Sequence, residues 1–184
     1  MMRRVLVLAA VAAVGVAGSS RQGSRPPVKS GTSMADSAEQ VMLNVRSLLT
    51  NEGVQRGEMF ADSAYIFDDN TRFELRTVRA TFNTSTGVKD GTMRGDRGRY
   101  NLRQQVLEGY GNVVITTNDG KRLTSPHVRY SQASNEVSSD SAFTMVETDG
   151  KRISGVGFRA DPQLNNVVVL KGARGRGSFT LPGQ

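Results

Sequence analysis

From Val41 onward, apolar and polar residues alternate with a period of two in many short stretches. Phe73-Glu74-Leu75 and Tyr100-Asn101-Leu102 are examples. Successive side chains of a strand point to opposite faces, so this alternation predicts strands with one face in a core and the other in solvent. Turn-forming residues separate the stretches at Asp68-Asp69-Asn70, Asn118-Asp119-Gly120 and Asp149-Gly150. The pattern therefore predicts antiparallel hairpins and an all-β fold.

The strand pattern recurs at intervals of roughly thirty residues. Four apolar positions begin the repeats, spaced 34, 30 and 30 residues apart: Met59, Met93, Leu123 and Ile153. A small residue follows each start by two positions: Ala61, Gly95, Ser125 and Gly155. An apolar residue follows each start by fourteen positions: Phe73, Leu107, Val137 and Val167. One unit of this length cannot bury its own apolar face, so the hairpins are expected to stack around a continuous core. We expect both apolar sets to face the interior and the small residues to lie where backbones approach closely.

The segment 41–49 fits two structures. Positions 41, 45, 48 and 49 have the spacing of a helical stripe, whereas positions 41, 43 and 45 alternate as in a strand. We favour the strand, because Asn51-Glu52-Gly53 then forms the turn into the first repeat.

The first 18 residues have the order of a secretory targeting segment. Arg3 and Arg4 precede an apolar run that ends at Gly18 and is shorter than the roughly 20 residues that span a bilayer as a helix. Val16-Ala17-Gly18 is similar to the start of a lipoprotein signal, but Ser19 stands where the lipid-bearing cysteine would be. Residues 1–18 are therefore expected to be a cleaved signal peptide or a retained membrane anchor.

Composition divides the rest of the chain into three parts. Residues 19–38 are rich in Ser, Gly, Pro and Lys and have too little apolar surface to fold, so a flexible linker is expected there. The repeats define a folded domain over 39–175. Residues 176–184 are expected to be a flexible tail, beginning within a Gly- and Arg-rich stretch.

The remaining composition narrows the function. The chain has no cysteine, which excludes disulfides, thiolate metal sites and a cysteine nucleophile. His127 is the only histidine, so neither a metal cluster nor a Ser-His-Asp arrangement has support, and beside Pro126 it is interpreted as structural. The net charge of +7 suits an anionic lipid or a nucleic acid, but the interleaved aromatic and basic residues of nucleic-acid binders are absent. We predict no enzymatic activity, no cofactor, no metal and no nucleic-acid partner.

Several segments resemble the LptC family of the lipopolysaccharide export machine. Arg56–Ala64 and Gly95–Tyr100 look like two copies of its strand motif, although Ile66 stands where an aromatic residue is common. Gly109–Ile115 and Asp119–Leu123 are similar to the strand, turn and strand that follow in that family. The resemblance extends over about 41–175.

The resemblance implies a twisted, open β-jellyroll whose apolar interior holds acyl chains. Such a protein would lie in the periplasm, attached to the inner membrane by its N-terminus, or free there if the signal is cleaved. It would receive lipopolysaccharide from an inner-membrane ABC transporter and pass it to a periplasmic bridge protein of the same fold. A soluble, LptA-like bridge protein and a purely structural envelope-assembly module are the alternatives, because the shared fold does not separate these roles.

The residues expected to carry these roles fall into two groups. Interior aromatic side chains would contact lipid: Phe82, Tyr100, Tyr130, Phe143 and Phe158. Residues on the two terminal strands would contact proteins, because an unpaired strand edge accepts another strand. These are Val41, Leu43 and Val45 near the transporter, and Val167, Val168 and Val169 near the bridge protein. Alternatively, the residues Val167 to Val169 only form the last core strand, and Lys171 and the basic tail prevent other strands from pairing with its edge.

Overall fold

The computed structural model describes residues 33–84 and 86–176. The expected signal or anchor, most of the expected linker and nearly all of the expected tail lie outside the described residues. Within the described ranges, no helix is long and apolar enough to cross a membrane.

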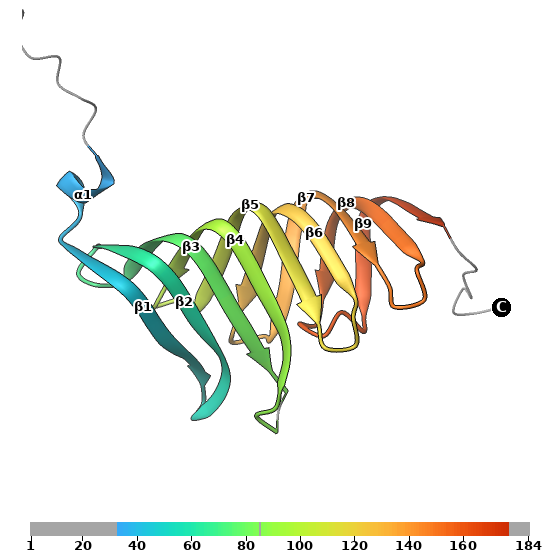
Figure 1. Ribbon diagram of the computed structural model, residues 1–184, viewed down its shortest axis with the longest axis horizontal. Coiled ribbons are helices and arrows are strands. Elements are labelled where there is room, and N and C mark those ends of the chain that lie inside the picture. Colours follow the sequence, from blue (N-terminus) through green and yellow to red (C-terminus); the bar gives the residue numbers. More distant parts are fainter. Residues whose placement is uncertain (1–32, 85, 177–184) are drawn as a thin grey trace, which may run out of the picture. The chain divides into compact units, whose positions relative to one another are not determined.

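Strands make up almost all of the described chain. After the short helix α1 (Met34–Ser37) come nine strands: β1 (Gln40–Asn51), β2 (Val54–Phe67), β3 (Arg72–Asn83), β4 (Lys89–Asn101), β5 (Val106–Thr117), β6 (Arg122–Ser131), β7 (Glu136–Val146), β8 (Arg152–Ala160) and β9 (Val167–Arg176). They form one sheet in chain order, with every neighbouring pair antiparallel (Figure 1). The predicted all-β fold of consecutive hairpins is confirmed, and segment 41–49 is a strand.

The strands are bent near their middles, where the regular pairing is interrupted. The register shifts between Arg94 and Arg97, Tyr110 and Val113, Thr124 and Arg129, Ser139 and Ala142, and Ser154 and Val156. Bulges of this kind bend a strand and increase its twist. Because the shifts occur at corresponding places in successive strands, they form a row, here called the bend, over which the sheet folds into two halves.

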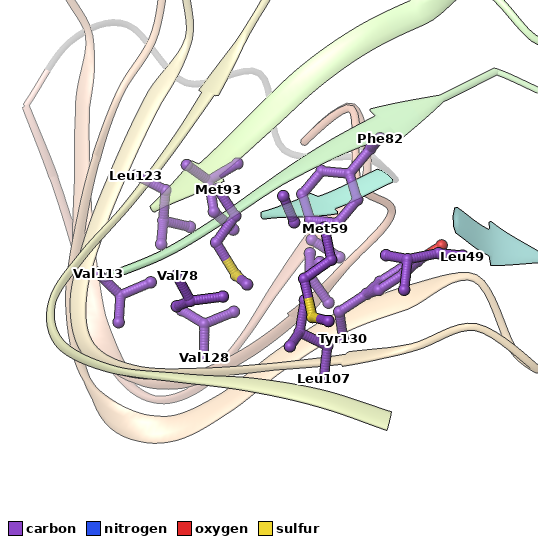
Figure 2. Close-up of a cluster of buried hydrophobic side chains, with 14 of the residues drawn as sticks. Leu49, Met59, Val78, Phe82, Met93, Leu107, Val113, Leu123, Val128 and Tyr130 are labelled. Carbon is purple, nitrogen blue, oxygen red and sulfur yellow. The ribbon is translucent and has the colours of Figure 1, made fainter. Parts of the chain in front are cut away.

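Contacts between distant strands show that the two halves face each other. The rings of Phe82 on β3 and Tyr130 on β6 lie 4.7 Å apart between centroids, although two strands separate β3 from β6 in the sheet. The space between the halves is the core, and Figure 2 shows side chains from several strands meeting there. The sheet stays open, since β1 and β9 each pair with one neighbour only.

The predicted inner face of the repeats is confirmed. Five of the eight apolar repeat positions are buried in the core: Met59, Met93, Leu107, Leu123 and Val137. The other three are half-buried and pack against it: Phe73, Ile153 and Val167. The period of thirty residues thus corresponds to one hairpin, and each hairpin adds one layer of apolar side chains.

Three of the four small repeat residues lie at the bend; the fourth, Ala61, pairs with Val45 on β1 without a register shift. Gly95, Ser125 and Gly155 fall inside the segments where the register shifts. A side-chain carbon at Gly155 would collide with Cγ1 of Val169 and lie 2.9 Å from the carbonyl oxygen of Lys171. A carbon at Gly95 would have its nearest neighbours at 3.4 Å, which is an ordinary contact. Of these two glycines, Gly155 therefore has the less space, because β9 packs against it.

We expect Gly155→Leu to lower the free energy of unfolding by about 1–3 kcal/mol, because the larger side chain overfills the bend against β9. Gly95→Leu should lower it less, since the nearest atoms there are farther away. Urea unfolding of both variants measures the difference. Two variants as stable as the wild-type protein would show that these glycines occupy ordinary exposed turn positions.

Candidate functional site

The five aromatic residues predicted to contact lipid all lie in the interior. Their exposed fractions are 0% for Phe82, Tyr130 and Phe158, 4% for Phe143 and 6% for Tyr100. The structure pairs Phe82 with Tyr130, and it pairs Phe143 with Phe158 at 5.0 Å between ring centroids. Their side chains fill the space between the halves. An acyl chain could enter only if some of them moved apart.

Polar groups accompany the two interior tyrosines. The Tyr130 hydroxyl donates to Oδ1 of Asn135 at 3.2 Å, and burial raises the pKa of Tyr130 to about 12, so that this phenol stays protonated. The Tyr100 hydroxyl accepts a hydrogen bond of 3.1 Å from Nε2 of Gln132, whose side chain is itself buried. The other amide atom, Oε1 of Gln132, is buried without a hydrogen-bond partner among the described residues. The interior is thus apolar with a small polar cluster near the β6–β7 turn.

The hairpin turns of the two halves meet along the side opposite the bend, which we call the seam. Because the strands alternate in direction, the turns that follow β1, β3, β5 and β7 lie at one end of the strands, and those that follow β2, β4, β6 and β8 lie at the other. Folding of the sheet at the bend brings these two sets of turns together. The Nδ2 group of Asn51, at the β1–β2 turn, donates to the carbonyl oxygen of Gln132 at 3.2 Å. Nζ of Lys121, at the β5–β6 turn, lies 2.6 Å from Oδ1 of Asn165 in the β8–β9 loop. Polar contacts between turns therefore join the two halves along the seam.

The β8–β9 loop also places a side chain into the core at the seam. Leu164 is 1% exposed and belongs to the core cluster, and its backbone has a φ of 55°, in the left-handed region that leucine rarely adopts. The Asp161 carboxylate holds the loop by accepting hydrogen bonds from the backbone N–H groups of Asn165 and Asn166. Sequence analysis missed Leu164, because a leucine among Asp, Gln and Asn residues has the pattern of an exposed turn.

The predicted partner residues lie on the two edge strands. On β1, Val41 and Leu43 are exposed at 44% and 72%, while Val45 is half-buried and packs against the core. On β9, Val168 is exposed at 59%, and Val167 and Val169 are half-buried against the core. Other exposed apolar side chains extend the two edges: Met42, Leu48 and Leu170. Each edge therefore combines unpaired backbone groups with an apolar surface.

His127 lies at the bend of β6. Its ring stacks on Tyr110 with the centroids 4.8 Å apart, and carboxylate oxygens of Glu108 and Asp140 are each 3.6 Å from one of its ring nitrogens. Among residues 33–84 and 86–176, no three or more His, Cys, Asp or Glu side chains gather in a way that could hold a metal ion.

The family comparison covers nearly the whole chain, and the structural comparison covers the sheet. The family model described as "Lipopolysaccharide-assembly, LptC-related" matches residues 5–177. A similar solved structure is LptH from Pseudomonas aeruginosa, described as the LptA homologous periplasmic component of the conserved lipopolysaccharide transport device. The TM-score is 0.51 at 13% identity, and the match covers 67% of this chain and 95% of LptH. No curated protein matches the chain in sequence.

The structural likeness concerns the fold, which is the β-jellyroll of the LptA homologue. The family match concerns the sequence and includes the repeats, the bend and both edge strands. It gives the chain a role in lipopolysaccharide transport. Because the match extends over well more than half of its residues, the chain belongs to the LptC-related family of lipopolysaccharide assembly.

Proposed function

We propose that the chain is a periplasmic lipopolysaccharide carrier held at the inner membrane by its N-terminal segment. It receives lipopolysaccharide from an inner-membrane ABC transporter and passes it to a periplasmic bridge protein of the same fold. The observation that carries this proposal is an apolar interior, continuous through the hairpins, that ends at two unpaired edge strands.

The interior suits acyl chains by its chemistry. Burial of one CH₂ group stabilises a complex by roughly 0.8 kcal/mol, so even part of an acyl chain provides enough to displace side chains from a core. Entry from the seam is the easiest route, because there the two halves are joined by side-chain hydrogen bonds such as those of Asn51 and Lys121. At the bend, in contrast, the strand backbones run continuously from one half to the other, so the halves cannot separate there.

The edge strands suit the two protein partners. β1 is the first strand after the N-terminal segment and the linker, so its edge, with Val41 and Leu43, would face the transporter at the membrane. β9 lies at the other end of the sheet, and Val168 and Leu170 would pack beneath an added strand of the bridge protein. Strand addition at both ends joins successive proteins into one continuous apolar surface.

Site-specific photocrosslinking in cells tests the proposal. Photoreactive residues at Tyr130 and Phe143 should capture lipopolysaccharide, and one at Val168 should capture the bridge protein. The matched control is Arg129, which neighbours Tyr130 on β6 but is exposed on the opposite face of the sheet. A probe at Leu43 should capture a transporter subunit.

Three other results would contradict parts of the proposal. Lipid captured from Arg129 and not from Tyr130 would show that lipid binds the outer face. Protein captured from Val168, with no lipid captured from any interior position, would favour a purely structural assembly module. A protein that works after cleavage of residues 1–18, with no transporter captured at Leu43, would favour a soluble bridge protein.

A further inference from the structure

Arg56 is an extra residue in the pairing of β1 with β2. Thr50 on β1 pairs with Gln55, and Leu49 pairs with Gly57, so Arg56 between these two pairs has no partner on β1. A bulge of this kind interrupts the regular pairing and re-aims a side chain. Strict alternation would place Arg56 on the outer face, because Gly57 beside it lies on the inner face opposite the buried Leu49. The bulge frees Arg56 from that alternation.

The guanidinium of Arg56 lies on the inner side of β2 and is partly removed from water. Its Nε is buried without a hydrogen-bond partner among the described residues. Burial is the larger influence on the pKa of the Tyr130 hydroxyl and raises it, whereas the positive charge of Arg56 lowers it, as an opposite charge does at short range. Tyr130 is fully buried between the two halves. A charge that reaches its hydroxyl therefore comes from the inner side of the sheet.

Arg56 differs from the other arginines whose exposure the structure describes. Only Arg56 and Arg72 among them are half-buried, and Arg72 pairs with two carboxylates. The rest are exposed, including Arg79 and Arg94, which face each other on β3 and β4 and remain in contact with water. No ion pair of the described residues includes Arg56. A partly desolvated cation without an anion is costly, so this position suits an anion supplied by a ligand.

Arg56 lies at the seam, where the interior meets solvent. The β1–β2 turn beside it is joined to the β6–β7 turn by the hydrogen bond from Asn51 to the carbonyl oxygen of Gln132. The Gln132 side chain is 1% exposed, and its Oε1 has no hydrogen-bond partner among the described residues. On the inner side lies Tyr130, whose ring packs on Phe82. The place therefore suits an amphipathic ligand, with acyl chains beside the two rings, an anion at Arg56 and a hydrogen-bond donor toward Gln132.

We propose that Arg56 binds a phosphate group on the headgroup of the lipid that the interior carries. The inference rests on the proposed function, because the acyl chains of the same lipid occupy the interior. A guanidinium presents a planar fork of N–H donors that matches the oxygens of a phosphate, and such charge-assisted hydrogen bonds are stronger than neutral ones. A phosphate on the acylated sugar of lipid A lies next to the acyl chains, so one ligand can engage both. The headgroup then lies at the seam beside the β1–β2 turn.

Two lipids with the same acyl chains separate the role of the headgroup from that of the interior. Radiolabelled lipid A with both phosphates is compared with radiolabelled, phosphate-free lipid A, and the equilibrium binding of each to the full chain in detergent is measured. The wild-type protein should bind the phosphorylated lipid about tenfold more tightly. Arg56→Gln should bind the phosphorylated lipid about tenfold more weakly than the wild-type protein does, and its affinity for the phosphate-free lipid should change by less than about twofold.

The matched control is Arg129→Gln, which removes the same charge from the exposed outer face of β6. It should leave both affinities within about twofold of the wild-type values, because an exposed charge away from the ligand is screened. Arg56→Lys keeps the charge without the planar fork, so its preference for the phosphorylated lipid should lie between those of the wild-type protein and Arg56→Gln. Equal weakening of both lipids by Arg56→Gln would show that the arginine only covers the core with its stem, and would overturn the proposal. So would an Arg56→Gln protein with the wild-type preference.

The wild-type protein alone tests the inference even if Arg56→Gln does not fold. Equal affinity of the wild-type protein for the two lipids would overturn the phosphate site and leave lipid carriage intact. Binding of neither lipid would overturn carriage, and the phosphate site with it. Millimolar inorganic phosphate should displace no more phosphorylated lipid A than chloride does at the same ionic strength, because phosphate alone brings no acyl chains. Full displacement by inorganic phosphate would assign Arg56 to a free anion and overturn the lipid headgroup as its ligand.

Discussion

Leu123→Asp should abolish the folded state of the sheet. Leu123 is fully buried on β6, where it pairs with Ile115 on β5 and Met145 on β7, both of them buried as well. An unpaired carboxylate at such a position costs several kcal/mol, a large part of the roughly 5–15 kcal/mol by which a domain is stable. We expect an aggregated protein, or one without a cooperative thermal transition, as measured by circular dichroism during heating.

Thr124→Asp is the matched control for this prediction. Thr124 follows Leu123 on the same strand but points to the outer face, where it is half exposed. The new charge is the same and stays in contact with water, so the melting temperature should remain close to that of the wild-type protein. A soluble Leu123→Asp protein with an unchanged melting temperature would contradict the assignment of the inner face in every repeat.

Phe82→Ala should lower the free energy of unfolding by about 3–5 kcal/mol, as removal of a fully buried phenylalanine does in other cores. The ring packs on Tyr130 across the interior, so it joins the two halves of the sheet in addition to filling volume. Phe60→Ala is the control, because Phe60 is only half-buried on β2, with Arg46 above its ring. Urea unfolding should separate the two variants clearly. A loss below about 1 kcal/mol for Phe82→Ala would show that the halves close again around the gap.

Much of the fold can be predicted from the sequence because its contacts are periodic. Each strand alternates between the core and solvent, and each hairpin takes about thirty residues, so positions such as Met59, Met93 and Leu123 recur in register. Turn residues mark the hairpin ends, for example at Asp149-Gly150, where φ of Gly150 is 81°. One physical requirement, a shared apolar face, produces both the sequence pattern and the sheet.

Contacts that do not repeat are not predictable in this way. Phe82 and Tyr130 meet because the sheet folds at the bend, and nothing in either local sequence indicates the other as its partner. Leu164 enters the core from a loop whose neighbours are polar. The facing of Arg79 and Arg94 depends on the exact register of two strands, and a slip of either strand by one residue would separate the two arginines onto opposite faces.

The chain order of the strands also affects how the protein reaches its structure. Each strand pairs only with the strands next to it in the chain, so no strand depends on pairing with a segment made much later. Hairpins close within microseconds, whereas synthesis adds roughly 5–20 residues each second. The sheet can therefore grow from its N-terminal end as the chain emerges, one hairpin at a time. The inner face of an early hairpin is covered only when later strands arrive, as Phe82 on β3 is covered by Tyr130 on β6, so the growing sheet exposes the apolar face of its last few strands until the next hairpins are added.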